Sequence, residues 1–402
     1  MPEAFVLNYR GEGRGKMNIH LAQPSLNEDH WTAWPSDVAP YTVGVEEEVM
    51  LVDPTRRWAL AQRIEDALAV LAPELAGYVS AETHQAAIEI RGDPQATVGA
   101  AIRQLRRLRG GLSRALAAID LSAAAAGTHP LAIWTETEVT PSSRYQLIHR
   151  TMRDLTTREP TFALHVHIAV PNPDSAIELY NRLRVHLPML LALSGNSPFW
   201  RGRDAGFVST RTILFQAFPR TGMPRRYDSY GEWAEAVDLQ IRSGALPEST
   251  FLWWDVRPQP KFGTIEVRVM DAQSNVADTA TLVALVQSIA RLELEEGYVD
   301  DHMIRAEEAL AENRFIAARD GVDAQLIDPT TASMRSSRTL LAELIDASRP
   351  HAEALGCRDE LERAAALADE PGAARQRRYP PREDALVALV SELAAGFSGG
   401  DG

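Results

Sequence analysis

Ionisable residues recur at alternate positions in four short apolar segments of the chain. The segments span about 42–52, 86–91, 162–170 and 262–270. The alternating residues are Glu46 and Glu48, Glu89 and Arg91, His165 and His167, and Glu266 and Arg268. Because successive side chains of a strand point to opposite faces, each segment is predicted to be a strand with one aliphatic and one ionisable face.

The ionisable faces have two explanations. An antiparallel sheet with one side in water is the simpler one. A solvated face, however, usually mixes Thr, Ser, Lys and Gln, whereas these positions hold almost only Glu, His and Arg. If the strands are neighbours, their carboxylates repel unless a cation compensates, and glutamate oxygens with a histidine nitrogen suit Mg²⁺ or Mn²⁺. The residues alone leave both explanations open.

Carboxylates, metal ions and arginines together indicate a class of chemistry. Metal ions bridge phosphate oxygens and arginines neutralise developing charge, as phosphoryl transfer requires. Metal-assisted hydrolysis is the alternative. The arginines favour phosphate, because the planar guanidinium matches the geometry of phosphate oxygens.

Glu47 lies between Glu46 and Glu48 and faces the aliphatic side of its strand. An unpaired carboxylate there would be costly. Glu47 is therefore predicted to lie at a strand edge, to reach solvent or to meet an arginine, and to be structural.

Helices must hold these strands in place. Residues 94–119 have apolar residues at helical spacing, and the arginines of this segment look like a solvated helix face. The predicted helices are 94–119, 174–193 with Pro188 as a kink, 276–296 and 303–319, followed by a mostly helical region after 330. We expect an N-terminal extension at 1–40, a single α+β catalytic domain at 41–396 and a flexible tail at 397–402.

Composition narrows the class of protein. The 402 residues are 45% hydrophobic and 24% charged, which is typical of a globular domain. A net charge of −14 argues against a nucleic-acid partner, and no segment is apolar enough to span a membrane. The N-terminus lacks the apolar core of a signal peptide, and Cys357 is the single cysteine. A cytoplasmic location is therefore expected.

Longer motifs occur in a fixed order along the chain. They are TVGVEEEVMLVDP, GTHP at 127–130, LHVHIAV, ALSGNSPFWRG at 192–202, STRTILFQAFPRTGMP at 209–224, LWWDVRPQPKFGTIEVRVMDAQ at 252–273 and GAARQR at 372–377. Together they resemble the carboxylate–amine ligase family, the glutamate–cysteine ligase type 2 group, over roughly residues 41–396.

The resemblance implies a glutamine-synthetase-like fold, in which a curved, largely antiparallel sheet forms a funnel with helices packed outside. It also implies a reaction in which ATP, with two or three Mg²⁺ or Mn²⁺ ions, phosphorylates a carboxylate, typically the γ-carboxylate of glutamate. An amine such as cysteine then attacks the acyl phosphate, giving an amide, ADP and phosphate.

The resemblance also assigns roles to residues. The implied metal ligands are Glu46, Glu48, Glu82, Glu89, His167 and Glu266. The implied anion-handling catalytic residues are Arg211, Arg268 and Arg257. His167 and Arg268 are placed at the nucleotide phosphates, and His165 is expected beside them, shaping the site.

Two other classes remain open from the sequence. One is a metal-dependent hydrolase of amide or phosphate bonds, which would use the same carboxylates without ATP. The other is a non-catalytic ligand-binding relative, against which the number of mutually repelling carboxylates argues. The acceptor amine and the oligomeric state, for which a homodimer is one option, are not fixed by the sequence.

Overall fold

The computed structural model of the chain describes residues 31–133, 135, 137–158 and 160–399. Its strands are β1 (Val43–Asp53), β2 (Ala59–Leu60), β3 (Val79–Ala81), β4 (Ala87–Arg91), β5 (Ser122–Ala124), β6 (Ala163–Ala169), β7 (Phe199–Trp200), β8 (Arg203–Asp204), β9 (Thr221–Gly222), β10 (Trp253–Trp254), β11 (Val256–Gln259), β12 (Thr264–Asp271), β13 (Gln325–Asp328) and β14 (Ser333–Ser336). Its helices are α1 (Ile64–Ala69), α2 (Pro73–Ala76), α3 (Val98–Ala117), α4 (Ser143–Met152), α5 (Pro173–Ser194), α6 (Thr210–Phe215), α7 (Tyr230–Arg242), α8 (Val276–Glu296), α9 (Asp301–Arg305), α10 (Glu307–Asp320), α11 (Ser337–Leu355), α12 (Arg358–Asp369), α13 (Gly372–Gln376) and α14 (Glu383–Phe397).

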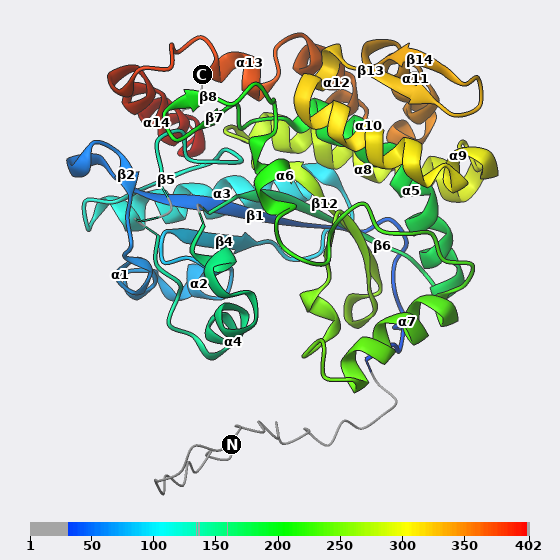
Figure 1. Ribbon diagram of the computed structural model, residues 1–402, viewed down its shortest axis with the longest axis horizontal. Helices are drawn as coiled ribbons and strands as arrows, with labels where there is room; N and C mark the ends of the chain where they lie inside the picture. Colours follow the sequence, from blue (N-terminus) through cyan, green and yellow to red (C-terminus); the bar gives the residue numbers. More distant parts are fainter. Residues whose placement is uncertain (1–30, 134, 136, 159, 400–402) are drawn as a thin grey trace, which may run out of the picture.

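A single large sheet lies at the centre of the described chain. Its strands run in the order β11-β12-β6-β1-β4-β3, with β2 and β5 also pairing with β1, and every pair is antiparallel. The four strands predicted from alternation are therefore consecutive neighbours, β12, β6, β1 and β4. In Figure 1 they cross the middle of the molecule, with α8 and α10 to α12 on one side and α2, α4 and α7 on the other.

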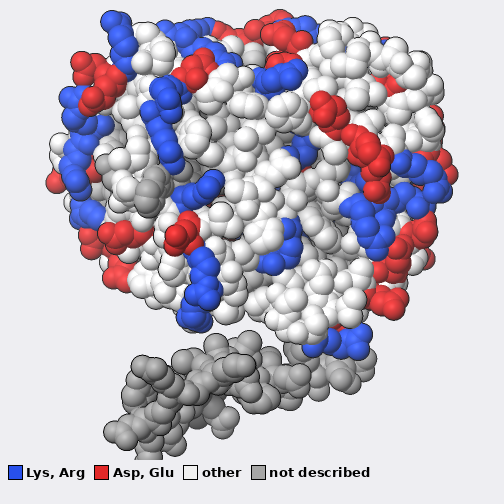
Figure 2. Space-filling view, in the orientation of Figure 1, with Lys and Arg blue, Asp and Glu red and all other residues white. Residues whose placement is uncertain are grey.

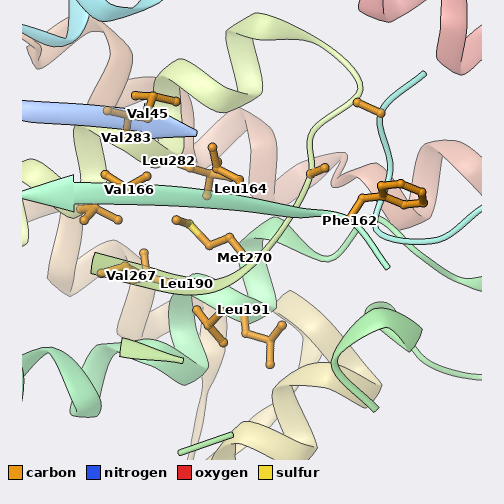
Figure 3. Close-up of a cluster of buried hydrophobic side chains, with 14 of the residues drawn as sticks. Val45, Phe162, Leu164, Val166, Leu190, Leu191, Val267, Met270, Leu282 and Val283 are labelled. Carbon is orange, nitrogen blue, oxygen red and sulfur yellow. The ribbon is translucent and has the colours of Figure 1, made fainter. Parts of the chain in front are cut away.

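The aliphatic face of the sheet packs on helices. Figure 3 shows Val45, Val166 and Val267 from β1, β6 and β12 beside Leu190 and Leu282 from α5 and α8. All of these side chains are buried. Burial of a Val or Leu side chain contributes roughly 1.5–3 kcal/mol, so this face fixes which way each strand points. The alternate side chains are thereby forced to the opposite face.

Helix ends follow the local capping chemistry. Thr97 accepts a hydrogen bond from the Ala100 amide, so α3 begins at Val98, slightly later than the predicted 94. Pro188 is accommodated inside α5, as expected, and α8 spans the predicted 276–296. The predicted helix 303–319 is interrupted at Ala306, which separates α9 from α10.

The described end of the predicted N-terminal extension is packed on the domain. The rings of Trp31 and Trp233 lie 5.7 Å apart, and the Trp34 indole donates to the Val170 carbonyl at 2.7 Å. Tyr230 donates to the Thr32 carbonyl at 2.7 Å. The remainder of that extension, residues 1–30, and residues 400–402 of the predicted tail lie outside the described chain.

The surface carries both signs of charge. Figure 2 shows acidic and basic side chains interspersed around the rim of the face in view, with a largely uncharged centre. No helix in the described part of the chain is both long enough and apolar enough to cross a membrane. The excess of acidic residues thus does not gather into one field on this face.

Candidate active site

The register of the sheet brings the ionisable residues together. Glu46 lies between Arg91 of β4 and His165 of β6, and Glu48 lies opposite Glu89. On the far side of β6, Glu266 lies opposite His167. The face predicted from alternation is therefore one continuous polar surface.

Glu46, His165 and Glu266 form the tightest cluster on this surface. One potential ligand atom from each lies within 4.8 Å of the others. His165 Nδ1 is 3.6 Å from Glu46 Oε2 and 3.8 Å from Glu266 Oε1. His167 Nε2 is beside them, 3.7 Å from Glu46 Oε1, while its Nδ1 meets Thr264 Oγ1 at 3.0 Å. Gly44 makes room, because a Cβ there would lie 3.3 Å from the His167 Cβ.

Glu266 is held in place by donors from three side chains. Arg257 Nε and Gln259 Nε2 each donate to Glu266 Oε2 at 2.6 Å, and Arg268 ion-pairs with Oε1. Burial alone would raise the pKa of Glu266, but Arg257 and Arg268 outweigh it and hold that pKa well below its ordinary value. Glu266 is therefore an anchored carboxylate anion.

This cluster fits a divalent cation. His165 Nε2 and His167 Nε2 are buried without a hydrogen-bond partner among the described residues. Burial, reinforced by Arg268, lowers the pKa of His165 to about 4, so its imidazole is neutral at pH 7, as a metal ligand must be. Burial opposes ionisation of Glu46, but its contacts with His165 and His167 outweigh this and lower its pKa. Carboxylate oxygens and an imidazole nitrogen suit Mg²⁺ or Mn²⁺.

A second acidic group, Burial and the nearby Glu82 raise the pKa of Glu48 to about 7, and the same two causes raise that of Glu89 well above its ordinary value. Glu82 follows β3, and its carboxylate accepts from the Thr83 amide at 2.8 Å. Three carboxylates that disfavour one another's ionisation would be stabilised by a cation between them.

Arg211 approaches this group from α6. Its two terminal nitrogens each donate at 3.1 Å, to the Val269 and Arg268 carbonyls, while its Nε has no partner in the described chain. The α6 N-terminus is fixed by Asp271, which accepts from Ser209 Oγ at 2.8 Å and from Ser197 Oγ at 2.6 Å. Sequence reasoning treated the SGNSP segment as a turn and did not identify this support.

A cavity of about 890 Å³ opens at this end of the polar surface. The residues that line it are Glu48, Glu82, Thr83, His84, Ala87, Arg144, Tyr145, Ile148, Thr161, Arg211, Phe215, Phe218, Trp253 and Arg268. Four of the predicted site residues, Glu48, Glu82, Arg211 and Arg268, thus share one cavity with an apolar wall. Arg144 and Tyr145 lie on α4, for which the sequence offered no functional signal.

Comparisons with known proteins agree with this geometry. The family described as "Glutamate-cysteine ligase family 2(GCS2)" matches residues 42–388. The chain belongs to this family. Two proteins of Rubrobacter xylanophilus, named "Putative glutamate--cysteine ligase 2-1" and "2-3", are 40% and 37% identical over 357 residues each; the alignments cover 89% and 88% of this chain and 94% and 96% of theirs.

Solved structures confirm the expected fold. The glutamate–cysteine ligase of Francisella tularensis, in complex with AMP, superposes with a TM-score of 0.64 at 14% identity, covering 92% of this chain and 91% of that one. A bifunctional glutathione synthetase from Pasteurella multocida gives 0.65 at 13% identity, over 89% of this chain and 52% of its own. Membership of glutamate–cysteine ligase family 2 makes the chain an ATP-dependent carbon–nitrogen ligase, as the resemblance predicted.

The family's site has a matched counterpart behind the sheet. Glu47 is fully buried on the aliphatic face, where Arg109 donates to both of its oxygens at 2.7 and 2.8 Å. Thr279 donates to the same carboxylate at 2.8 Å. The prediction that Glu47 meets an arginine or another compensating environment is confirmed. The prediction that Arg109 belongs to a solvated helix face is wrong, because Arg109 lies in the apolar stripe of α3 with Leu105 and Leu112.

Arg257 lies differently from the free anion clamp that the sequence suggested. Its Nη1 donates to the Thr250 and Leu252 carbonyls at 2.9 and 2.6 Å, and its other nitrogens face Glu266. Asp255, considered as its partner, instead pairs with Arg314. In this arrangement Arg257 supports Glu266.

Proposed function

We propose that the enzyme phosphorylates the γ-carboxylate of glutamate with ATP and couples the product to an amine, of which cysteine is the family's example. The observation that carries this proposal is the union of two acidic groups with Arg211 and Arg268 on one polar surface beside a cavity. Phosphoryl transfer needs this combination of cation ligands and anion-stabilising donors.

The acidic groups divide the metal-holding role. Glu46, His165 and Glu266 would hold one Mg²⁺ or Mn²⁺ ion, with His167 beside them, and Glu48, Glu82 and Glu89 offer a second carboxylate set. The ions would bridge ATP phosphate oxygens and offset the negative charge that grows during transfer.

The arginines act on the substrates. Arg268 is anchored on Glu266 and borders the cavity, so it would stabilise the transferring phosphoryl group. Arg211, with an unpartnered Nε, would hold the substrate carboxylate and later the developing oxyanion. Arg257 would keep Glu266 oriented and ionised.

The second step forms the amide. The amine nitrogen, after losing a proton, forms a bond with the acyl carbon through its lone pair. The bond from that carbon to the phosphate oxygen breaks, and phosphate leaves with the electron pair. The buried face behind the sheet contributes no group to this step, since its one carboxylate is already paired.

The test is a reaction of the purified chain with ATP, MgCl₂, glutamate and cysteine, followed by ADP release and product mass. We expect ADP release to require both substrates and to stop when Mg²⁺ is chelated. The product should have the mass of the two substrates less one water. Cleavage of an amide or phosphate ester without ATP would contradict the proposal. Glu312→Gln, at an exposed position on α10, is the control for handling.

A further inference from the structure

The cavity has two chemically different ends. Glu48, Arg211 and Arg268 border it where it meets the polar surface. Away from them its lining includes Phe215, Phe218 and Trp253, together with the apolar residues Ala87 and Ile148. A site for cysteine alone needs to enclose only one sulfur atom beyond the reacting portion, so a wall of three aromatic rings is more than that amine requires.

The three rings form one continuous wall. The ring centroids of Phe215 and Phe218 are 5.6 Å apart, and those of Phe218 and Trp253 are 6.3 Å apart in an edge-to-face arrangement. They come from α6, the turn after it, and β10, which pairs with β9. Aromatic rings at such distances attract one another and offer further edges and faces to a ligand ring.

The wall adjoins the reacting end of the cavity. The Arg211 guanidinium carbon lies 5.8 Å from the centroid of the Phe215 ring, and both residues belong to α6. If Arg211 holds the activated carboxylate, an amine nitrogen that reaches the acyl carbon must place its side chain a few bonds away. That position is bounded by Phe215.

Packing does not account for all of this wall. Phe218 and Trp253 are half-buried and pack partly against the hydrophobic core, as many surface aromatics do. Phe215 is also half-buried, yet it is not among the residues that pack against the core within the described chain. Its recorded partners are Phe218 and Arg211. A core role alone would therefore leave the position of Phe215 unexplained.

We infer that the acceptor is a primary amine with an aromatic or bulky aliphatic side chain, about the size of phenylalanine, which packs on Phe215, Phe218 and Trp253. This inference rests on the proposed function, because it assigns the amine of that reaction. It adds a preference that follows from burial: an aromatic side chain removes much more apolar surface from water than the cysteine side chain does.

The experiment compares three nucleophiles with ATP, Mg²⁺ and glutamate: hydroxylamine, L-cysteine and L-phenylalanine. Hydroxylamine is too small to need the wall and reports acyl-phosphate formation through the hydroxamate. We expect kcat/KM for phenylalanine to exceed that for cysteine by about tenfold or more, as burial of an aromatic ring predicts. Phe215→Ala should lower kcat/KM for phenylalanine about tenfold, mainly through KM, and leave the hydroxylamine rate unchanged.

Two further variants keep the result interpretable. Phe215→Leu retains apolar volume and should give an intermediate KM, which separates loss of contact from loss of folding. Phe315→Ala removes a phenylalanine of α10 whose recorded ring contacts are with Phe207 and Arg319, away from the cavity lining, and should leave every rate unchanged. Melting temperatures of all variants would be measured in parallel.

The outcomes separate the two proposals. Hydroxamate formation with cysteine preferred over phenylalanine would overturn the inference and leave the proposed function standing. An equal loss of all three activities in Phe215→Ala, at unchanged melting temperature, would likewise overturn it. No hydroxamate from the wild-type enzyme would overturn the proposed function, and the inference with it.

Discussion

The two faces of the central sheet treat the same residue types in opposite ways. On the aliphatic face Glu47 is fully buried and receives donors from Arg109 and Thr279. On the polar face Glu46 lies among two histidines whose Nε2 atoms have no hydrogen-bond partner in the described chain. A satisfied buried charge maintains structure, whereas an unsatisfied cluster is available for ligands.

The largest expected effect concerns the polar face. Glu266→Gln keeps the shape of the side chain but removes the charge that Arg257 and Arg268 surround. We expect Mg²⁺-dependent ADP formation to fall by roughly a thousandfold or more, since both cation binding and the placement of Arg268 depend on that carboxylate. Steady-state ADP release measures this. Near-normal turnover would remove Glu266 from the site.

The next effect concerns the aliphatic face and appears in stability. Arg109→Ala leaves the Glu47 carboxylate buried without its bidentate partner, which typically costs about 3–5 kcal/mol. Denaturant unfolding measures the change. Arg106→Ala, at an exposed position of the same helix, is the matched control and should change stability by less than about 0.5 kcal/mol. Equal effects of the two variants would contradict the structural role of Arg109.

A smaller effect extends the comparison to histidines. His129 is buried with both ring nitrogens used: Nε2 faces the Trp58 carbonyl at 2.9 Å, and Nδ1 accepts from the Leu131 and Ala132 amides. Burial lowers its pKa from 6.5 to about 4. Between these pH values the unfolded chain binds a proton that the folded chain does not. The free energy of unfolding should therefore fall as the pH falls, by at most about 1.4 kcal/mol per pH unit.

The variant His129→Asn isolates that contribution. Its side-chain oxygen can still accept from the two amides but takes up no proton. Unfolding titrations should therefore show a shallower loss of stability between pH 6.5 and 4, with ligase activity near neutral pH retained. An unchanged slope would show that His129 is not a source of the acid sensitivity.

Alternation predicted the strands well because a period of two residues is imposed by backbone geometry. It placed Glu46, Glu48, Glu89 and Glu266 on one face, and the register of the sheet confirms that shared face. Pairing order is a long-range property, so the sequence could state only what would follow if the strands were neighbours.

The sequence was less informative where a partner comes from a distant element. Arg109 was grouped with the exposed arginines of its helix, although its spacing from Leu105, Leu108 and Leu112 places it within the apolar stripe. Attention to that spacing would have paired it with Glu47. For Phe215 and Tyr145 no such signal exists, because their shared cavity is created by the packing of α6, α4 and β10.

The most direct test of the contrast between the faces compares Glu46→Gln with the adjacent Glu47→Gln. Activity and the free energy of unfolding would be measured for both variants. We predict that Glu46→Gln lowers kcat about a hundredfold or more with stability near wild type, because a ligand charge is lost. Glu47→Gln should lose about 1–3 kcal/mol of stability and keep most of its activity. Equal losses of activity in the two variants would contradict the division of the strand into a ligand face and a structural face.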